Sequence, residues 1–385
     1  MFVRSLYLLL LICVLSVVVA KNDKTLRIKL QQRKDNGRRM NAIHRRLASN
    51  SHSVNETLID QFNIFYEGYV HVGTPPQPFI VDFDTGSPIF WLVATNCTDE
   101  KSGKQCVEPH LYDYQNSSTV TTIGERFKIE YGSGATEGFY VTDTLGLTAD
   151  PSVANVKKVK FGAADLLAGW MSDADGLFGL SFGDDIKNND PAFIDVLNED
   201  HVFENPIFTV WLDGISKDNS SEKLGGEIEF GGTDDSRCGE VISTTKAQVV
   251  RGPWWTFNIQ TVSINGKEVG NAVALTDTGT TAIFVNDQIY AELIKKAPIL
   301  GTQKFDCDTK LPDLQMDMLV EGKNLTLTTE DFVLRVEDKC FPSVYLSPLG
   351  ESLDILLGDP FIRRYCQIHN YEKKTVGFAL AKHDS

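Results

Sequence analysis

The chain has 385 residues with 52 acidic and 37 basic side chains, which give a formal net charge of −15. This acidic balance predicts no nucleic-acid partner. The seven histidines are scattered and no C-x-x-C pair occurs, so the sequence predicts no metal site. The length is sufficient for more than one domain of ordinary size.

Residues 1–20 are predicted to be a signal peptide. Arg4 supplies the positive start, Leu6 to Val19 form the apolar stretch, and Val18-Val19-Ala20 ends in the small residues of a cleavage site. No later run approaches the roughly 18 apolar residues that a membrane span requires. We therefore expect an exported chain without a membrane span, in the secretory pathway and either secreted or lysosomal.

Residues 21–52 are strongly basic. Residues 1–50 hold eleven basic and two acidic side chains, a net charge of +9, whereas the remainder holds 26 basic and 50 acidic side chains, a net charge of −24. Such a stretch is also typical of a solvated tail or a nucleic-acid-binding patch. Because it follows a signal peptide and precedes an acidic body, we predict a removable propeptide that acts as an intramolecular inhibitor of a zymogen.

The body after residue 52 has the texture of an all-β protein. Short β-branched or alternating runs, such as Tyr69 to Val72 and Phe257 to Ile264, are separated by glycine, proline, asparagine and aspartate. A weak internal repeat divides the body near the turn-rich segment Gly231 to Ser236. The predicted lobes are 53–233 and 234–385.

Sequons and cysteines agree with export. Five N-x-[ST] sequons make the chain a candidate glycoprotein. They are centred on Asn55, Asn96, Asn116, Asn219 and Asn324. Cys13 leaves with the signal peptide, and the six remaining cysteines predict three disulfides.

Two copies of one tetrapeptide carry the candidate chemistry. Asp84-Thr85-Gly86-Ser87 and Asp277-Thr278-Gly279-Thr280 each follow an apolar, strand-like run. A turn that closes a β-hairpin explains one such motif but not both. If the two aspartates meet, they cannot both ionise easily and share a proton, which makes an acid/base device.

With their surroundings, the two motifs resemble the pepsin/cathepsin D family of aspartic endopeptidases, from about Phe62 to Ala381. Trp91 falls seven residues after Asp84, as the family pattern has it. The other matching segments are Gly73-Thr74-Pro75, the flap tip Tyr131-Gly132-Ser133-Gly134, Asp175 to Leu180, and Leu356 to Arg363.

The resemblance implies an all-β, bilobal fold with a shared interdomain sheet under a central cleft. It implies that Asp84 and Asp277 activate a water that attacks the peptide bond of an extended polypeptide at acid pH. No cofactor is expected, and we expect a monomer. The supporting residues are then Thr85, Gly86, Ser87, Thr278, Gly279 and Thr280 around the aspartates, with Tyr131, Gly132 and Trp91 in the flap.

The family's disulfides match Cys97–Cys106 and Cys307–Cys340, and the remaining pair predicts Cys238–Cys366.

One departure from the family pattern concerns Asp82, where relatives usually carry an aliphatic residue. Residues i and i+2 of a strand share a face, so Asp82 should face the cleft beside Asp84. It is interpreted either as a solvated or hydrogen-bonded acid or as a subsite residue that accepts a basic substrate side chain.

Other classes of protein were weighed. A catalytically silent peptide-binding homologue predicts the loss of an aspartate, the flap tyrosine or a supporting residue, and none is lost. A phosphoaspartyl enzyme would carry Asp-Lys-Thr-Gly and membrane spans. A half-size protease that self-assembles would carry one motif instead of two.

Overall fold

The computed structural model describes residues 25–34, 64–107, 110–131, 134–147, 155–169, 174–183, 192–199, 203, 205–214, 224–248, 252–336, 339–347 and 353–383. The predicted signal peptide, the sequons at Asn55 and Asn219 and the flap residue Gly132 lie outside these residues. Among the described residues, no helix is long and apolar enough to cross a membrane.

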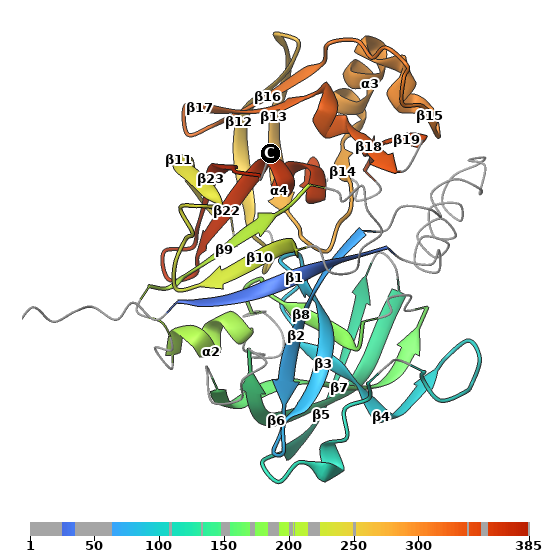
Figure 1. The fold of residues 1–385 in the computed structure, drawn as a ribbon, viewed down its shortest axis with the longest axis vertical. Helices are drawn as coiled ribbons and strands as arrows, with labels where there is room; N and C mark the ends of the chain where they lie inside the picture. Colours follow the sequence, from blue (N-terminus) through green and yellow to red (C-terminus); the bar gives the residue numbers. More distant parts are fainter. Residues whose placement is uncertain are drawn as a thin grey trace, which may run out of the picture.

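The fold is all-β and bilobal, with a layer of strands between the two lobes (Figure 1). The first lobe contains β2 (Ile64–Val72), β3 (Gln77–Asp84), β4 (Trp91–Asp99), β5 (Thr121–Tyr131), β6 (Gly134–Gly146), β7 (Asn155–Ala168), β8 (Gly176–Gly179) and the helix α2 (Phe193–Glu199). The shared layer contains β1 (Leu26–Lys34), β9 (Ile207–Leu212), β10 (Leu224–Phe230), β11 (Cys238–Lys246), β22 (Tyr365–Asn370) and β23 (Thr375–Ala381).

These strands form one sheet in the order β11-β23-β22-β9-β10-β1-β2-β3-β8-β4-β7-β6-β5. The second lobe has its own sheet, in the order β17-β16-β12-β13-β21-β14-β20. Its strands are β12 (Thr256–Ile264), β13 (Lys267–Thr276), β14 (Ile283–Val285), β16 (Gln315–Val320), β17 (Lys323–Thr328), β20 (Val344–Leu346) and β21 (Ile355–Leu357). A smaller sheet and two helices complete the lobe: β15 (Phe305–Asp306), β18 (Val333–Val336), β19 (Lys339–Pro342), α3 (Asp287–Lys296) and α4 (Asp359–Arg364).

The helix α3 illustrates how the sequence specifies these elements. Asn286 caps its first turn and accepts a hydrogen bond from the Ile289 N–H at 3.1 Å. Lys295 and Lys296 lie in the last turn, where positive charge complements the helix dipole. Ile289 and Leu293, four residues apart, are buried and hold the helix against the lobe.

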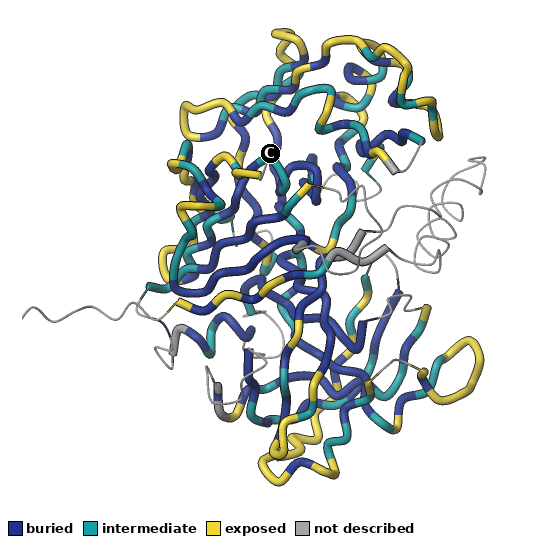
Figure 2. Tube along the Cα trace, in the orientation of Figure 1, coloured by how far each residue is buried: buried dark blue, intermediate teal, exposed yellow. Residues whose placement is uncertain are grey.

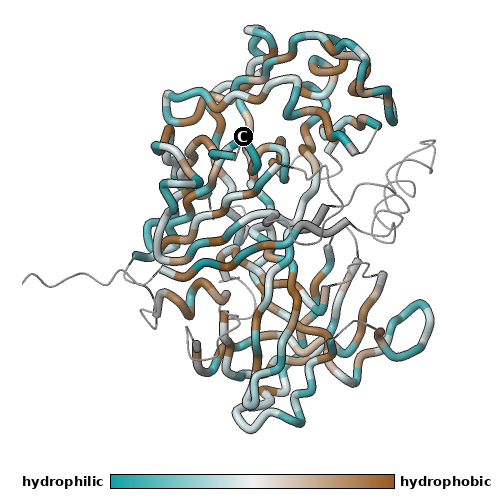
Figure 3. Tube along the Cα trace, in the orientation of Figure 1, coloured by the Kyte–Doolittle hydropathy of each residue, from teal (hydrophilic) through white to brown (hydrophobic). Residues whose placement is uncertain are grey.

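The main hydrophobic core has aliphatic and aromatic members in both lobes, and its first-lobe part contains a chain of aromatic rings. Phe83, Phe90 and Phe178 are buried and stack in a chain, with ring centroids 4.6 and 5.0 Å apart. The strands β9, β10 and β22 of the shared layer are buried along most of their length (Figure 2), and apolar residues follow the strands whereas polar residues gather at the loops (Figure 3).

The strand β1 comes from the predicted propeptide and lies inside the sheet, a position that was not predicted from the sequence. It pairs with β10 on one side and β2 on the other. Leu26, Ile28 and Leu30 are buried, whereas Arg27 and Lys29 between them are exposed. Because successive side chains of a strand point to opposite faces, the apolar residues of this basic segment pack into the protein while its basic residues remain exposed.

Three disulfides close the fold. Cys97–Cys106 and Cys307–Cys340 lie within single lobes, while Cys238–Cys366 joins β11 to β22 in the shared layer. The last pair packs with Trp211 in a small buried cluster. It therefore links two segments that are 128 residues apart in the chain.

Candidate active site

Asp84 and Asp277 stand at the ends of equivalent strands in the two lobes. Asp84 ends β3, which pairs in parallel with β8, and Asp277 follows β13, which pairs in parallel with β21. Asp277 donates its N–H to the Leu357 carbonyl at 3.0 Å, and the Asp84 carbonyl accepts from the Leu180 N–H at 2.8 Å. The internal repeat in the sequence thus corresponds to a repeated strand pairing that presents one aspartate from each lobe.

Each carboxylate is held by its own loop in the same way. Asp84 Oδ1 accepts from the Gly86 N–H at 2.8 Å, and Asp277 Oδ1 accepts from the Gly279 N–H at 2.9 Å. Asp84 Oδ2 accepts from the Ser87 hydroxyl and Asp277 Oδ2 from the Thr280 hydroxyl, both at 2.5 Å. Donors to a carboxylate stabilise its charged form and fix its orientation.

The two loops are cross-linked by their threonines. The Thr85 N–H donates to Thr278 Oγ1 at 2.9 Å, and the Thr278 N–H donates to Thr85 Oγ1 at 3.1 Å. The hydroxyls then donate across the interface, Thr85 to the Thr276 carbonyl at 3.1 Å and Thr278 to the Phe83 carbonyl at 2.6 Å. This reciprocal set of bonds fixes the spacing between the lobes at the carboxylates.

Glycine is required in both loops because the opposite carboxylate lies against it. A Cβ added at Gly86 would lie 2.5 Å from Asp277 Oδ1, and one at Gly279 would lie 2.7 Å from Asp84 Oδ1. Real Cβ atoms do not approach that closely, so any side chain here would push the two carboxylates apart.

The proximity of the two acids has an electrostatic consequence. Burial and the neighbouring Asp277 raise the pKa of Asp84 well above its ordinary value, and the bonds from Ser87 and Gly86 only partly oppose this. Like charges this close cannot both persist, so the pair favours a state with one proton. The pair can therefore both accept and donate a proton.

Tyr131 and Trp91 lie together at the end of the β5–β6 hairpin. Tyr131 ends β5 opposite Gly134, the first residue of β6. The Trp91 indole N–H donates to the Tyr131 hydroxyl at 2.8 Å, and Trp91 itself is fully buried. The buried indole thus anchors the tyrosine at the tip of the hairpin.

Asp82 lies in a row of residues that shares a sheet face with Trp91. The register pairs Glu67 of β2 with Asp82 of β3, Asp82 with Leu177 of β8, and Leu177 with Trp91 of β4. Residues directly opposite one another on paired strands point to the same face. Glu67 and Asp82 are both buried, at 2% and 5% exposure. Two acids therefore occupy the row that leads to Trp91.

Asp359, which follows Leu356-Leu357-Gly358, is a third acid near the pair and was missed as a site residue. It is 1% exposed, and neither carboxylate oxygen has a hydrogen-bond partner among the described residues. Arg363 Nη1 lies 3.9 Å from its Oδ2. Burial raises the pKa of Asp359 well above its ordinary value, and although Arg363 opposes this, Asp277 adds to it. The acid directly after the glycine of the repeated segment was the signal that could have identified it.

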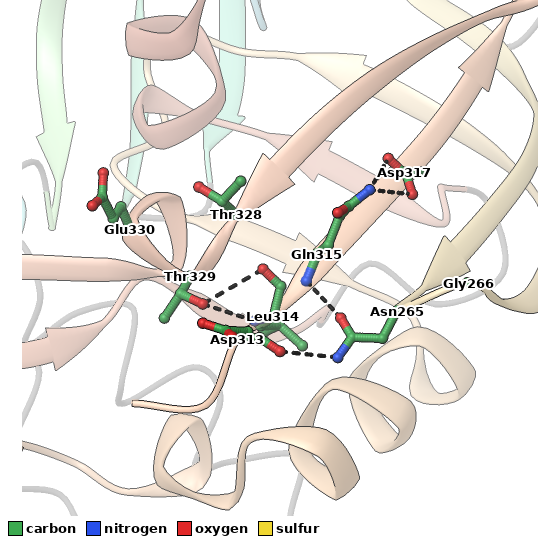
Figure 4. Close-up of a pocket in the computed structure, with 9 residues that line it drawn as sticks. All are labelled: Asn265, Gly266, Asp313, Leu314, Gln315, Asp317, Thr328, Thr329 and Glu330. Carbon is green, nitrogen blue, oxygen red and sulfur yellow. Dashed lines mark hydrogen bonds between the residues drawn. The ribbon is translucent and has the colours of Figure 1, made fainter. Parts of the chain in front are cut away.

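A cavity in the second lobe lies apart from this site (Figure 4). It is lined by polar residues that satisfy one another: the Asn265 amide donates to the Asp313 carbonyl at 2.9 Å, and the Gln315 amide donates to Asp317. In the part of the chain that the structure describes, no three His, Cys, Asp or Glu side chains are grouped as metal ligands. The cavity therefore adds no catalytic group to the carboxylate pair.

Comparisons with known proteins agree with this geometry. Residues 65–381 match the family model "Eukaryotic aspartyl protease". The chain is 32% identical to vacuolar protease A of Arthroderma otae over 87% of this chain and 82% of that protein. It is 29% identical to cathepsin D of Chionodraco hamatus over 97% of this chain and all of that protein, and 28% identical to gastricsin of Macaca fuscata fuscata over 82% of this chain and 84% of that protein. The chain therefore belongs to the eukaryotic aspartyl protease family and is an aspartic-type endopeptidase.

Proposed function

We propose that Asp84 and Asp277 are the catalytic dyad of an endopeptidase that is made as a zymogen and acts at acid pH. The observation that carries this proposal is the reciprocal bonding of Thr85 and Thr278, which sets one motif carboxylate against the other. Silent homologues have no need for this spacing, whereas a shared proton depends on it.

In the proposed reaction the dyad carries one proton and positions a water molecule. As the water oxygen attacks the scissile carbonyl carbon, the ionised carboxylate takes a water proton and the protonated one donates to the carbonyl oxygen. The product is a neutral gem-diol, with no covalent enzyme intermediate. The C–N bond then breaks as the amide nitrogen takes the proton that the first carboxylate had accepted from water, while a gem-diol hydroxyl gives its proton to the other carboxylate and restores the singly protonated dyad. Because burial and Asp277 raise the pKa of Asp84, we assign it the shared proton.

The test is hydrolysis of a peptide substrate at acid pH by the activated enzyme and by Asp277→Asn. We expect the variant to lose nearly all activity, because its amide can neither take a proton from the water nor share one. Asp306→Asn makes the same substitution at an exposed acid with an 81% exposed side chain and should retain activity. Unchanged hydrolysis in Asp277→Asn would refute the assignment of the dyad, and no hydrolysis by the activated wild type would favour the catalytically silent alternative.

The flap gives the site a cover. We assign Tyr131 the role of closing over an extended polypeptide substrate and excluding water, with Trp91 holding its hydroxyl at 2.8 Å. Trp91→Phe removes the indole donor and keeps an aromatic ring, so it should raise KM more than it lowers kcat if the bond serves to position the flap.

The zymogen proposal rests on the basic strand β1. Arg27 lies 2.7 Å from Asp234 and 3.3 Å from Glu229, both in the acidic body. Burial raises the pKa of Glu229, even though Arg27 opposes this. Burial acts in the same direction on Asp234, but bonds from Ser236 and the charge of Arg27 outweigh it and lower the pKa. A carboxylate attracts Arg27 only while ionised, so as pH falls the contact with Glu229 weakens first and that with Asp234 later.

The propeptide is thus expected to loosen stepwise on acidification and then to be cut. We would acidify the purified precursor and follow N-terminal processing by mass spectrometry, with and without a statine-type inhibitor of the dyad. Processing that is acid-triggered and blocked by the inhibitor is expected. A precursor that is fully active at neutral pH without cleavage would rule out the zymogen proposal.

Asp82 is proposed as a subsite residue that favours a basic substrate side chain. It shares a strand face with Asp84, and its neighbour Glu67 adds a second acid to the same row. Two acids directly opposite one another give this row an acidic character, which a cationic substrate side chain would complement. Cleavage of a peptide library by wild type and Asp82→Ala decides the matter: the variant should lose preference for lysine and arginine, and identical profiles would leave Asp82 a structural acid.

The proposed destination is the secretory pathway, as a monomer that is secreted or held in an acidic compartment. Asn96, Asn116 and Asn324 are exposed, as glycan acceptors must be. Removing N-glycans from the exported protein should lower its mass by one step for each occupied sequon, and an unchanged mass would exclude glycosylation.

A further inference from the structure

His383 follows β23 and joins two strands of the shared layer, β23 and β9, to the helix α4. Its Nδ1 lies 3.2 Å from Asp213 Oδ1, just after β9, and its Nε2 lies 2.8 Å from the Arg363 carbonyl oxygen, in the last turn of α4. The ring also lies beside Trp211 of β9, with centroids 6.0 Å apart. The group of His383, Asp213 and Arg363 is here named the His383 clamp.

The protonation state of the clamp follows from counting donors. A carboxylate oxygen and a carbonyl oxygen are both acceptors, so both ring nitrogens of His383 need an N–H. A neutral imidazole has only one N–H, and its other nitrogen would then direct a lone pair at an oxygen. The imidazolium ion donates at both positions and is the only form that satisfies both contacts.

Two charges support the imidazolium ion. The Asp213 carboxylate carries the opposite charge, and its Oδ1 also accepts from the Gly214 N–H at 2.8 Å, which keeps it oriented. The Arg363 carbonyl lies at the C-terminal end of α4, where the helix dipole favours a cation. The His383 side chain is 38% exposed, so solvent can supply and remove the proton.

The neighbouring cations each have another partner. Lys382 Nζ donates to the Asp235 carbonyl at 2.7 Å, and the Arg237 guanidinium lies over the Trp211 ring at 4.3 Å. The Arg363 guanidinium contacts the Tyr66 hydroxyl at 3.4 Å and Asp359 at 3.9 Å. Among the residues that the structure describes, Asp213 is the anion that the ring of His383 contacts, and Lys382, Arg237 and Arg363 each contact another group as well.

We propose that the His383 clamp is a pH-sensitive tie that closes when His383 is protonated. It fastens the segment after β23 to the last turn of α4 and to the end of β9. The first residue of α4 is Asp359, the buried acid whose pKa is raised in part by the charge of Asp277. Closure thus adds a charged link between the segment after β23, the end of β9 and the last turn of α4.

The test is a double-mutant cycle of His383→Gln and Asp213→Asn in the full chain, measured as unfolding equilibria in urea at pH 5 and pH 8. At pH 5, Asp213→Asn should lower the folded-to-unfolded ratio roughly threefold to tenfold in the wild-type background and little in His383→Gln. At pH 8 this coupling should disappear. Coupling that is equal at both pH values, larger at pH 8, or absent at both would overturn the proposal.

A second variant separates charge from packing. His383→Arg carries a permanent positive charge, so its coupling to Asp213 should persist from pH 5 to pH 8. If the coupling of the arginine variant falls with rising pH as that of the wild type does, another titrating group is responsible and His383 is not the switch. If Asp213→Asn does not fold, the stabilities of His383→Arg and His383→Gln give the same information. At pH 8 the stability difference between these two variants should be larger than the difference between wild type and His383→Gln. At pH 5 the two differences should be similar.

Discussion

The hydroxyl of Ser87 offers the sharpest test of how the dyad is tuned. Ser87 is buried and donates to Asp84 Oδ2 at 2.5 Å, a bond that lowers the pKa of Asp84 against the larger effects of burial and Asp277. Ser87→Ala removes this donor without adding bulk. The substitution should therefore raise the pKa of Asp84 further and make it hold its proton to higher pH.

The magnitude follows from the strength of the bond. A hydrogen bond to a charged group contributes about 1.5–3 kcal/mol, and about 1.4 kcal/mol corresponds to one pKa unit. Since Asp84 holds the shared proton in the proposed mechanism, its ionisation sets the alkaline limb of kcat/KM against pH. That limb should move upward by about one to two pH units in Ser87→Ala.

The assay is kcat/KM for a soluble peptide across the pH range, with Ser87→Thr as the matched control. Threonine keeps the hydroxyl, as Thr280 does in the second motif, so the control should retain the wild-type profile. An alkaline limb that stays in place or moves down in Ser87→Ala, with a normal control, would refute the assignment of the shared proton to Asp84.

Three further outcomes are expected. Because burial raises the pKa of Asp359, the folded state favours its protonated form, and the stabilisation this gives is complete at low pH and lost as pH rises. Asp359→Asn should therefore unfold at a higher urea concentration than wild type at pH 7 and at the same urea concentration at pH 3. Equal unfolding midpoints of the two proteins at both pH values would contradict this. Replacing both Cys238 and Cys366 by alanine opens a loop of 128 residues. The replacement should lower the free energy of unfolding, measured by guanidinium titration, by about 5 kcal/mol. A loss below about 1 kcal/mol would instead indicate residual order in the unfolded chain without the disulfide. Arg27→Gln should shift half-maximal precursor processing to higher pH, because the strand loses its contacts with the acidic body. Lys29→Gln removes the same charge from the same exposed face and should leave the pH of half-maximal processing unchanged. Equal shifts in both variants would mean that net charge alone matters.

Most of the residues that contact the two aspartates could be predicted, because the sequence patterns that identify them are local. Aspartate, threonine and glycine in one tetrapeptide encode a strand end, a cross-linking hydroxyl and a close approach, so two copies predict two similar loops. Residues such as Asp359 were harder to recognise. An acid after an apolar run reads as an ordinary helix start, and only its burial beside Arg363 makes it unusual.

The sequence by itself determined the family, the predominance of β-strands and the two motif loops, since each depends on residues close together in the chain. The tertiary structure decided which strand lies beside which. It inserted β1, which belongs to the predicted propeptide, between β10 and β2, because the apolar residues that alternate with its basic residues fit a buried sheet face. It also decided that His383 meets Asp213, 170 residues earlier in the chain. Such pairings depend on the shape and charge of surfaces assembled from distant segments, and short-range patterns do not encode them.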